Sequence, residues 1–262
     1  MVARGLGKPC VVGVRNLSIN NSLNSIITSE GEVIKSGDIV TIDGSNGRVL
    51  KGSANMVKPK LPKYFFEILD WARDLGKIHI KANADTIKEA QQAKGFKVDG
   101  IGLCRTEHMF FDEERILYVR QMILSKSKED RCEALNKILP FQKNDFKEIF
   151  SIMRSLPVTI RLLDPPLHEF LPKSEKEISI VASSLGISEK EIRDRISDLH
   201  EENPMLGHRG CRLAISYPEI YEMQCEAIFE ALIECKNEKI KVLPEIMIPL
   251  VATGQELEIL RI

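Results

Sequence analysis

From residue 64 onward, short apolar runs alternate with segments whose apolar residues recur at helical spacing. The runs that we expect to form strands are IHIKAN (78–83), GIGLC (100–104), VTIRLLD (158–164) and EIMIPLV (245–251). Strands that alternate with helices are joined by crossover connections and therefore run parallel. The pattern predicts an α/β fold, either an open sheet or a TIM-type (β/α)8 barrel.

Helices are predicted at 64–75, 85–94, 112–124, 129–155, 174–202 and 218–235, and a last one begins at 253. We expect Asp85 to cap the second helix, and Pro140 to bend or split the long one. The segment 174–202 should hold two charged helices, the second opened by a capping box of Ser188 and Glu191. The segment 205–214 fits either a short strand or a loop.

The first 55 residues have a different character, with many glycines and β-branched residues and little helical periodicity. Strands are predicted at 10–14 and 38–43, and residues 36–52 read as a hairpin. The lysines and prolines of 56–63 predict a linker. A complete barrel typically takes ~250 residues. Because 64–262 is shorter, we expect an incomplete barrel in a truncated chain.

Charge and cysteine content exclude several classes of protein. The 37 basic and 38 acidic residues are interspersed, which argues against a nucleic-acid-binding arm or a membrane-surface helix. No apolar run approaches the ~18 residues of a membrane span, and no secretory signal is visible. The six cysteines form no C-x-x-C pair. They predict reduced thiols in a cytoplasmic protein.

Three arginines lie at or near predicted strand ends. Arg105 follows GIGLC, Arg161 lies within VTIRLLD, and Arg209 lies in MLGHRGCR. Because active sites of (β/α)8 enzymes are built where strands end, the three guanidinium groups would converge on one anion if their strands are neighbours. A lone arginine in such a position is more often a surface or salt-bridge residue, but Arg161 interrupts an apolar run where an unpaired charge is costly.

For the other polar side chains near these strand ends, we favour supporting roles. On spacing alone, Glu107 and Asp164 neutralise the arginines, and Asp164 also stays open as a base or metal ligand. No diagnostic spacing of a nucleophile accompanies the histidines, so structural roles are favoured for His108, His168 and His208. Cys104 reads as a core residue.

Several motifs together resemble the pyruvate, phosphate dikinase family of phosphoenolpyruvate-using enzymes. They are VARGLGKPCVVG, ANADTIKEA, GIGLCRTEHMFF, IRLLDPPLHEFLP, NPMLGHRGCRL and EIMIPLV, which together span nearly the whole chain. The resemblance implies that 1–55 is the end of a swivelling β/β/α phosphohistidine domain, and that 64–262 is the first part of a phosphoenolpyruvate/pyruvate barrel. By the matching motifs, Arg105, Arg161 and Arg209 would bind phosphoenolpyruvate and pyruvate.

The family reaction interconverts ATP, pyruvate and phosphate with AMP, phosphoenolpyruvate and diphosphate through a phosphohistidine. In the family, that histidine precedes VARG, and the ligands of Mg²⁺ and a cysteine acid lie in later barrel strands. The resemblance thus implies a homodimeric, magnesium-dependent parent enzyme and a fragment that is inactive alone, with no complete catalytic set and no metal ligands. Fragments of a phosphoenolpyruvate synthase or a phosphoenolpyruvate:protein phosphotransferase, and a non-catalytic anion-binding module, are the alternatives.

Overall fold

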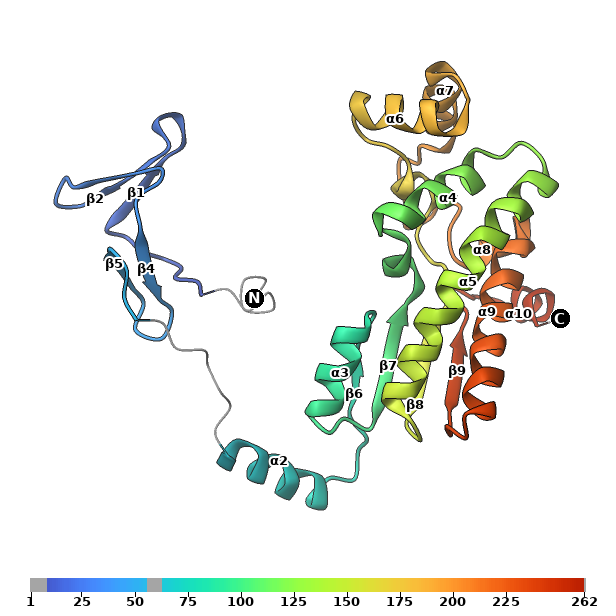
Figure 1. The fold of residues 1–262 in the computed structure, drawn as a ribbon, viewed down its shortest axis with the longest axis horizontal. Coiled ribbons are helices and arrows are strands. Elements are labelled where there is room, and N and C mark those ends of the chain that lie inside the picture. Colours follow the sequence, from blue (N-terminus) through green and yellow to red (C-terminus); the bar gives the residue numbers. More distant parts are fainter. Residues whose placement is uncertain (1–8, 56–62, 262) are drawn as a thin grey trace. The chain divides into compact units, whose positions relative to one another are not determined.

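The computed structural model describes residues 9–55 and 63–261, and the chain divides into two compact units, Met1–Leu75 and Gly76–Ile262 (Figure 1). The predicted boundaries between the domain 1–55, the linker 56–63 and the domain 64–262 stay a prediction. The division into compact units differs, because it places residues 63–75 with the first unit. The predicted linker 56–63 lies outside the described residues except for Lys63, which begins helix α2 (Lys63–Leu75).

The first unit holds two small antiparallel sheets. One is built from β1 (Leu17–Asn20), β2 (Ser25–Thr28), which follows the 3-10 turn η1 (Asn21–Leu23), and β3 (Val33–Lys35); the other from β4 (Val40–Asp43) and β5 (Arg48–Lys51). The hairpin is confirmed, and the Asp43 carboxylate accepts hydrogen bonds from Ser45 and Asn46 within its turn. The strand predicted at 10–14 is wrong: its apolar run pairs with no strand among the described residues, and Val12 is 86% exposed.

The second unit is built on a four-stranded parallel sheet in the order β6-β7-β8-β9. Its strands are β6 (Lys81–Asn83), β7 (Gly100–Arg105), β8 (Pro157–Arg161) and β9 (Leu243–Met247). The prediction of parallel strands is confirmed, although each strand is shorter than or offset from the sequence estimate. All four carboxyl ends lie along one edge, which in Figure 1 is the upper one.

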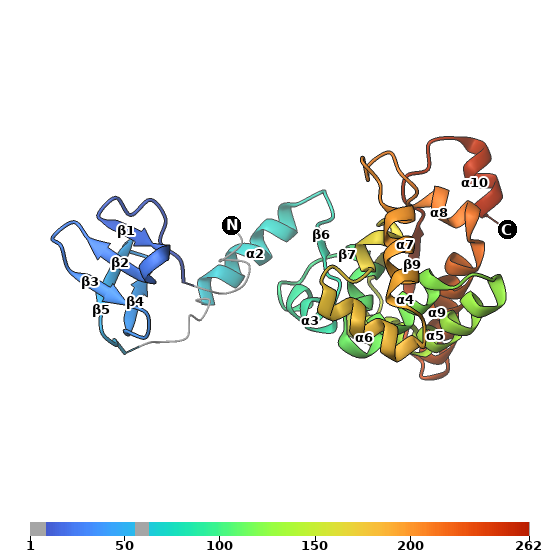
Figure 2. The same ribbon diagram turned by 90° about the horizontal axis from the view of Figure 1, so that it is seen from above.

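Helices α3, α5 and α9 cover one face of this sheet (Figures 1 and 2). Val158 and Ile160 of β8 and Phe146 and Phe150 of α5 form part of the buried core between them. The helical elements of the unit are α3 (Ile87–Gly95), η2 (Thr106–Phe110), α4 (Glu113–Leu124), α5 (Lys128–Met153), η3 (Leu167–Phe170), α6 (Glu175–Leu185), α7 (Glu189–Leu199), α8 (Cys211–Ser216), α9 (Pro218–Asn237) and α10 (Gly254–Leu260).

The structure corrects one local prediction, confirms another and narrows two that left alternatives open. Thr86, not Asp85, caps α3, because its hydroxyl accepts from Glu89 in a capping box. Pro140 does not split α5, which runs unbroken for 26 residues because buried side chains before and after the proline hold both halves on the core. The segment 205–214 is no strand but a turn leading into α8. The capping box of Ser188 at α7 is confirmed.

The opposite face of the sheet carries an ion pair that spans three strand spacings. Lys81 of β6 donates to Glu245 of β9 over 2.8 Å, and Thr159 of β8 contacts the same carboxylate. The lysine chain lies on Gly102 of β7, where an added Cβ would come within 3.0 Å of it. In a flat sheet β6 and β9 would lie ~14 Å apart. Side chains of a strand normally stand roughly perpendicular to the sheet. The contact between Lys81 and Glu245 therefore indicates that the sheet curves toward its polar face.

Candidate functional site at the carboxyl edge of the sheet

Two of the three predicted arginines end neighbouring strands. Arg105 is the last residue of β7, Arg161 is the last residue of β8, and the two are partners in the strand register. Cys104 and Ile160, one position earlier, are also partners, and both are fully buried on the helical face. Because side chains alternate along a strand, both arginines lie on the polar face.

Arg209 reaches the same edge from the loop before α8. The amide of Gly210 donates to the Asp164 carbonyl at 3.0 Å, and the amide of Cys211 donates to the Pro249 carbonyl at 3.0 Å. These two bonds tie the loop to the chain beyond β8 and beyond β9. Gly210 has φ +55°, and an added Cβ would lie 3.0 Å from the Pro249 carbonyl oxygen. Only glycine fits this position without strain.

Asp164 brings two of the guanidinium groups together. Its Oδ2 lies 3.1 Å from Arg161 Nη1 and 2.7 Å from Arg209 Nη2. Arg161 also donates through Nη2 to Glu107, and the carboxylates of Glu107 and Asp164 are only 6% and 7% exposed. The structure therefore pairs both acids with arginines, as the spacing indicated.

Arg105 is held by a different acid, which sequence reasoning assigned to a helix cap. Asp85 accepts from the Arg105 amide at 2.7 Å and from Arg105 Nη1 at 2.8 Å, and its Oδ2 also lies 2.8 Å from His108 Nδ1. The signal that was available is its place two residues after β6, at the edge where Arg105 also lies. Asp85 is thus a site residue that the cap interpretation missed.

The paired arginines keep donors for a ligand. A guanidinium has five N–H donors, and the acids of the site engage one of them on Arg105 and two each on Arg161 and Arg209. The three side chains are 32%, 20% and 18% exposed, so they are partly accessible. The cluster can therefore receive an anion while its internal ion pairs persist.

Two buried polar atoms in this cluster have no hydrogen-bond partner among the described residues, Arg161 Nε and Glu107 Oε2. Buried polar groups are otherwise almost always paired, and each exception calls for an explanation. A binding site is one such explanation, because its side chains are held ready for a ligand instead of being satisfied by the fold.

The remaining candidates have structural surroundings. Burial raises the pKa of the Cys104 thiol, which keeps it protonated in the core. The rings of His168 and His200 lie 6.2 Å apart, and His168 Nδ1 is buried without a partner in the described part of the chain. His208 Nε2 lies 2.8 Å from Ser216 Oγ, a spatial pair that the sequence did not reveal.

The residues of the site do not fit a magnesium centre. Glu107 and Asp164 are already engaged by arginines. Across residues 9–55 and 63–261, no three His, Cys, Asp or Glu side chains gather as metal ligands would. In the same ranges, every helix is too short or too polar to cross a bilayer.

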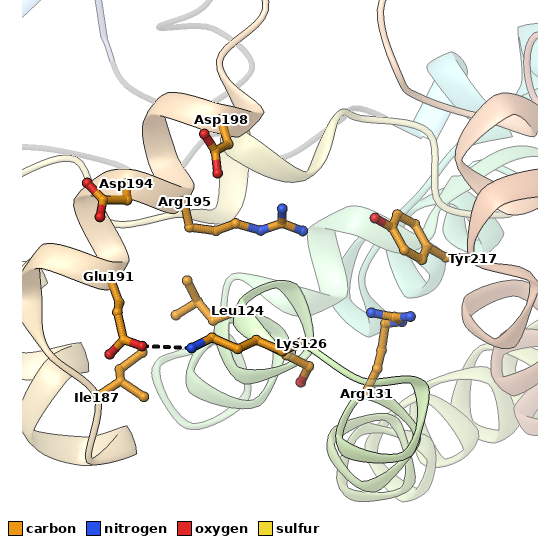
Figure 3. A pocket seen from close by; sticks show the side chains of 10 residues that line it. Leu124, Lys126, Arg131, Ile187, Glu191, Asp194, Arg195, Asp198 and Tyr217 are labelled. Atoms are coloured by element: carbon orange, nitrogen blue, oxygen red, sulfur yellow. Dashed lines mark hydrogen bonds and ion pairs between the residues drawn. The ribbon is translucent and has the colours of Figure 1, made fainter.

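A separate pocket of about 500 Å³ lies between α7 and the corner that joins α4 to α5 (Figure 3). Its lining holds equal numbers of basic and acidic residues, Lys126, Arg131 and Arg195 and Glu191, Asp194 and Asp198. Lys126 donates to Glu191, and Arg131 is paired with Glu219. None of the three strand-end arginines lines this pocket, so it is distinct from the candidate site.

Family models match both parts of the chain. Residues 60–261 match the model of the phosphoenolpyruvate-binding domain of PEP-utilising enzymes, and residues 1–47 match the model of their mobile domain. The chain therefore belongs to the PEP-utilising enzyme family.

Curated relatives within this family are similar over nearly the whole chain. The pyruvate, phosphate dikinase of Rhizobium meliloti is 51% identical over 98% of the chain, and that of Clostridium symbiosum is 44% identical over all of it. The chloroplastic enzyme of Flaveria pringlei is 48% identical over 98% of the chain. The chain spans only 29%, 30% and 27% of these three relatives, respectively.

Proposed function

We propose that this chain carries part of the phosphoenolpyruvate- and pyruvate-binding site of a pyruvate, phosphate dikinase. The observation that carries the proposal is the meeting of Arg161 and Arg209 on Asp164 at the carboxyl edge of the sheet, with Arg105 at the registered position of β7. Planar guanidinium forks match the oxygens of phosphate and carboxylate. Phosphoenolpyruvate carries both groups on three carbons.

The chemical task of the arginines is electrostatic. As the phosphoryl group transfers, negative charge spreads over its oxygens and over the enolate oxygen of pyruvate. Donors fixed in advance by Asp85, Glu107 and Asp164 stabilise this charge without reorganising. The described acids do not form a magnesium site, so the metal of the parent reaction enters no step here.

We also propose that the four-stranded sheet is part of a (β/α)8 barrel. The support is the curvature indicated by the Lys81–Glu245 ion pair and the order of parallel strands with helices on one face. In such a barrel the polar face would be the interior. For the parent protein we propose ATP and phosphate as further substrates, Mg²⁺ as cofactor and a homodimeric assembly. We also propose a cytoplasmic location, which suits the six free cysteines.

Calorimetric titration of the chain with phosphoenolpyruvate tests the proposal. We expect binding that weakens as salt is added and that falls about tenfold in Arg209→Lys, because an ammonium keeps the charge but loses the planar fork. Arg195→Lys, in the separate pocket, is the matched control and should bind as the parent chain does. Equal affinities in the two variants, or no binding by the parent chain, would contradict the proposed site.

A turnover assay addresses the isolated chain. We propose that it does not convert pyruvate, because the described residues offer arginines but no phosphoryl carrier or metal ligands. A pyruvate-dependent rate that disappears in Arg161→Ala would show that the chain is active alone.

A further inference from the structure

The chain leaves β8 through three buried residues that no longer belong to the ladder. Leu162, Leu163 and Asp164 are 2%, 0% and 5% exposed. The amide of Leu162 still donates to the Met247 carbonyl at 3.0 Å, but the strand ends at Arg161. The peptide groups of Leu163 are therefore buried outside the sheet, where both need partners.

Both partners are side chains of α9. Gln224 Oε1 accepts from the Leu163 amide at 2.8 Å, and the Tyr221 hydroxyl donates to the Leu163 carbonyl at 2.8 Å. The two residues are three positions apart and so share one face of the helix. Gln224 is fully buried and Tyr221 is 6% exposed. The amide and the carbonyl of Leu163 are thus both hydrogen-bonded by side chains of one helix.

A second glutamine accepts a hydrogen bond from the side-chain NH₂ group of the first. Because the Leu163 amide is a donor, Gln224 must present its oxygen to it and turn its NH₂ group away. Gln224 Nε2 then donates to Gln142 Oε1 of α5 at 3.4 Å, and Gln142 is itself 1% exposed. Two of the three helices that cover this face of the sheet, α5 and α9, therefore share one buried polar network that ends on Leu163.

We propose that Tyr221 and Gln224, with Gln142 behind them, are positioning residues for the anion site. Asp164 follows Leu163 directly, its carboxylate holds Arg161 and Arg209, and its carbonyl accepts from Gly210. A displacement of the Leu163 peptide therefore moves the acid that aligns both arginines. This inference rests on the proposed function for its ligand, but its geometry is a property of the free chain.

The test compares Gln224→Met, which leaves the Leu163 amide unpaired, with two controls. Ile228→Val, at a fully buried position one turn further along α9, removes a methylene without touching the network and is expected to cost stability alone. Gln224→Glu is the rescue at pH 6: buried glutamic acid stays protonated and offers the same acceptor and donor as glutamine.

Two readouts are used, the Arg Nε–Hε signals of ¹⁵N-labelled chain without ligand and the calorimetric affinity for phosphoenolpyruvate. We expect Gln224→Met to shift the signals of Arg161 and Arg209 and to weaken binding about tenfold, equivalent to ~1.4 kcal/mol. Gln224→Glu should restore both, and Ile228→Val should change neither. Tyr221→Phe, which removes only the hydroxyl, replaces Gln224→Met if that variant does not fold. It should shift the same arginine signals and weaken binding as well.

Arginine signals that match the parent chain in Gln224→Met and in Tyr221→Phe would overturn the positioning role. If the parent chain does not bind phosphoenolpyruvate, the proposed function fails, but the arginine signals still decide whether the network positions the cluster. The two proposals therefore fail separately.

Discussion

Two regions of the second unit each gather three basic side chains among three acids, yet they differ in how the charges are held. At the carboxyl edge of the sheet, the carboxylates of Glu107 and Asp164 are 6% and 7% exposed. In the pocket beside α7, the paired side chains of Lys126 and Glu191 are 83% and 47% exposed. Exposed ion pairs are screened by water and contribute little to folding stability. Removing one partner of a buried pair is strongly destabilising, because the other charge is left buried without a partner.

The difference teaches that burial, and not the number of charges, distinguishes a prepared site from a charged surface. The strand-end arginines are fixed by acids and by backbone bonds, and they retain donors for a ligand. In the pocket, Lys126 and Glu191 form an exposed pair (Figure 3), whereas Arg131 at its rim is buried against Glu219 and belongs with the buried pairs. Three substitutions would break or sharpen this contrast.

The largest effect is expected for Asp164→Ala, which removes the shared partner of Arg161 and Arg209. Breaking a buried ion pair by deleting one partner costs ~3–5 kcal/mol, because the remaining charge stays buried. Urea unfolding followed by circular dichroism measures the loss. Glu191→Gln, at the exposed pocket pair, should lower the urea midpoint far less, because water screens that pair. Similar midpoints for both variants would mean that the two clusters do not differ in energy.

A smaller effect is expected for Gly210→Ala. The left-handed backbone and the approach of the Pro249 carbonyl together should cost ~1–3 kcal/mol and displace Arg209. Gly186→Ala at the end of α6 is the control, because its φ is +67° but an added Cβ meets nothing within 4 Å. Thermal unfolding of both variants separates the two causes. A loss no larger for Gly210 than for Gly186 would show that the Arg209 loop yields without cost.

The sequence predicted the parts of this contrast that depend on local pattern. Parallel strands, the hairpin of 36–52 and the Ser188 capping box follow from periodicity and side-chain chemistry, and the structure confirms them. The place of Arg105 and Arg161 at strand ends was also readable, because a cation in an apolar run is conspicuous.

What the sequence did not reveal depends on contacts between distant residues. Asp85 looked like a helix cap until the register of β6 and β7 placed it against Arg105. The hydrogen bonds of Tyr221 and Gln224 to Leu163 join residues that lie 58 and 61 positions apart in the sequence. On a helix that also faces the core, these polar residues carry no pattern that distinguishes them from capping or surface residues.

The smallest effect concerns the acid behaviour of the pocket pair. Hydrogen bonds from Lys126 and then from Ser188 lower the pKa of Glu191 to about 2 from its ordinary 4.5. Because the folded value is the lower one, this group adds stability above pH 4.5, and that stability is lost as the pH falls toward 2. The start of α7 should therefore lose helix content over this window.

Glu191→Gln should flatten that part of a circular-dichroism titration, and salt should reduce the difference from the parent chain because the lysine pair is exposed. Identical acid titrations in both proteins would mean that the Ser188 hydroxyl alone holds the start of the helix. The pocket would then contain no functioning ion pair at that position, and its contrast with the buried strand-end cluster would become sharper still.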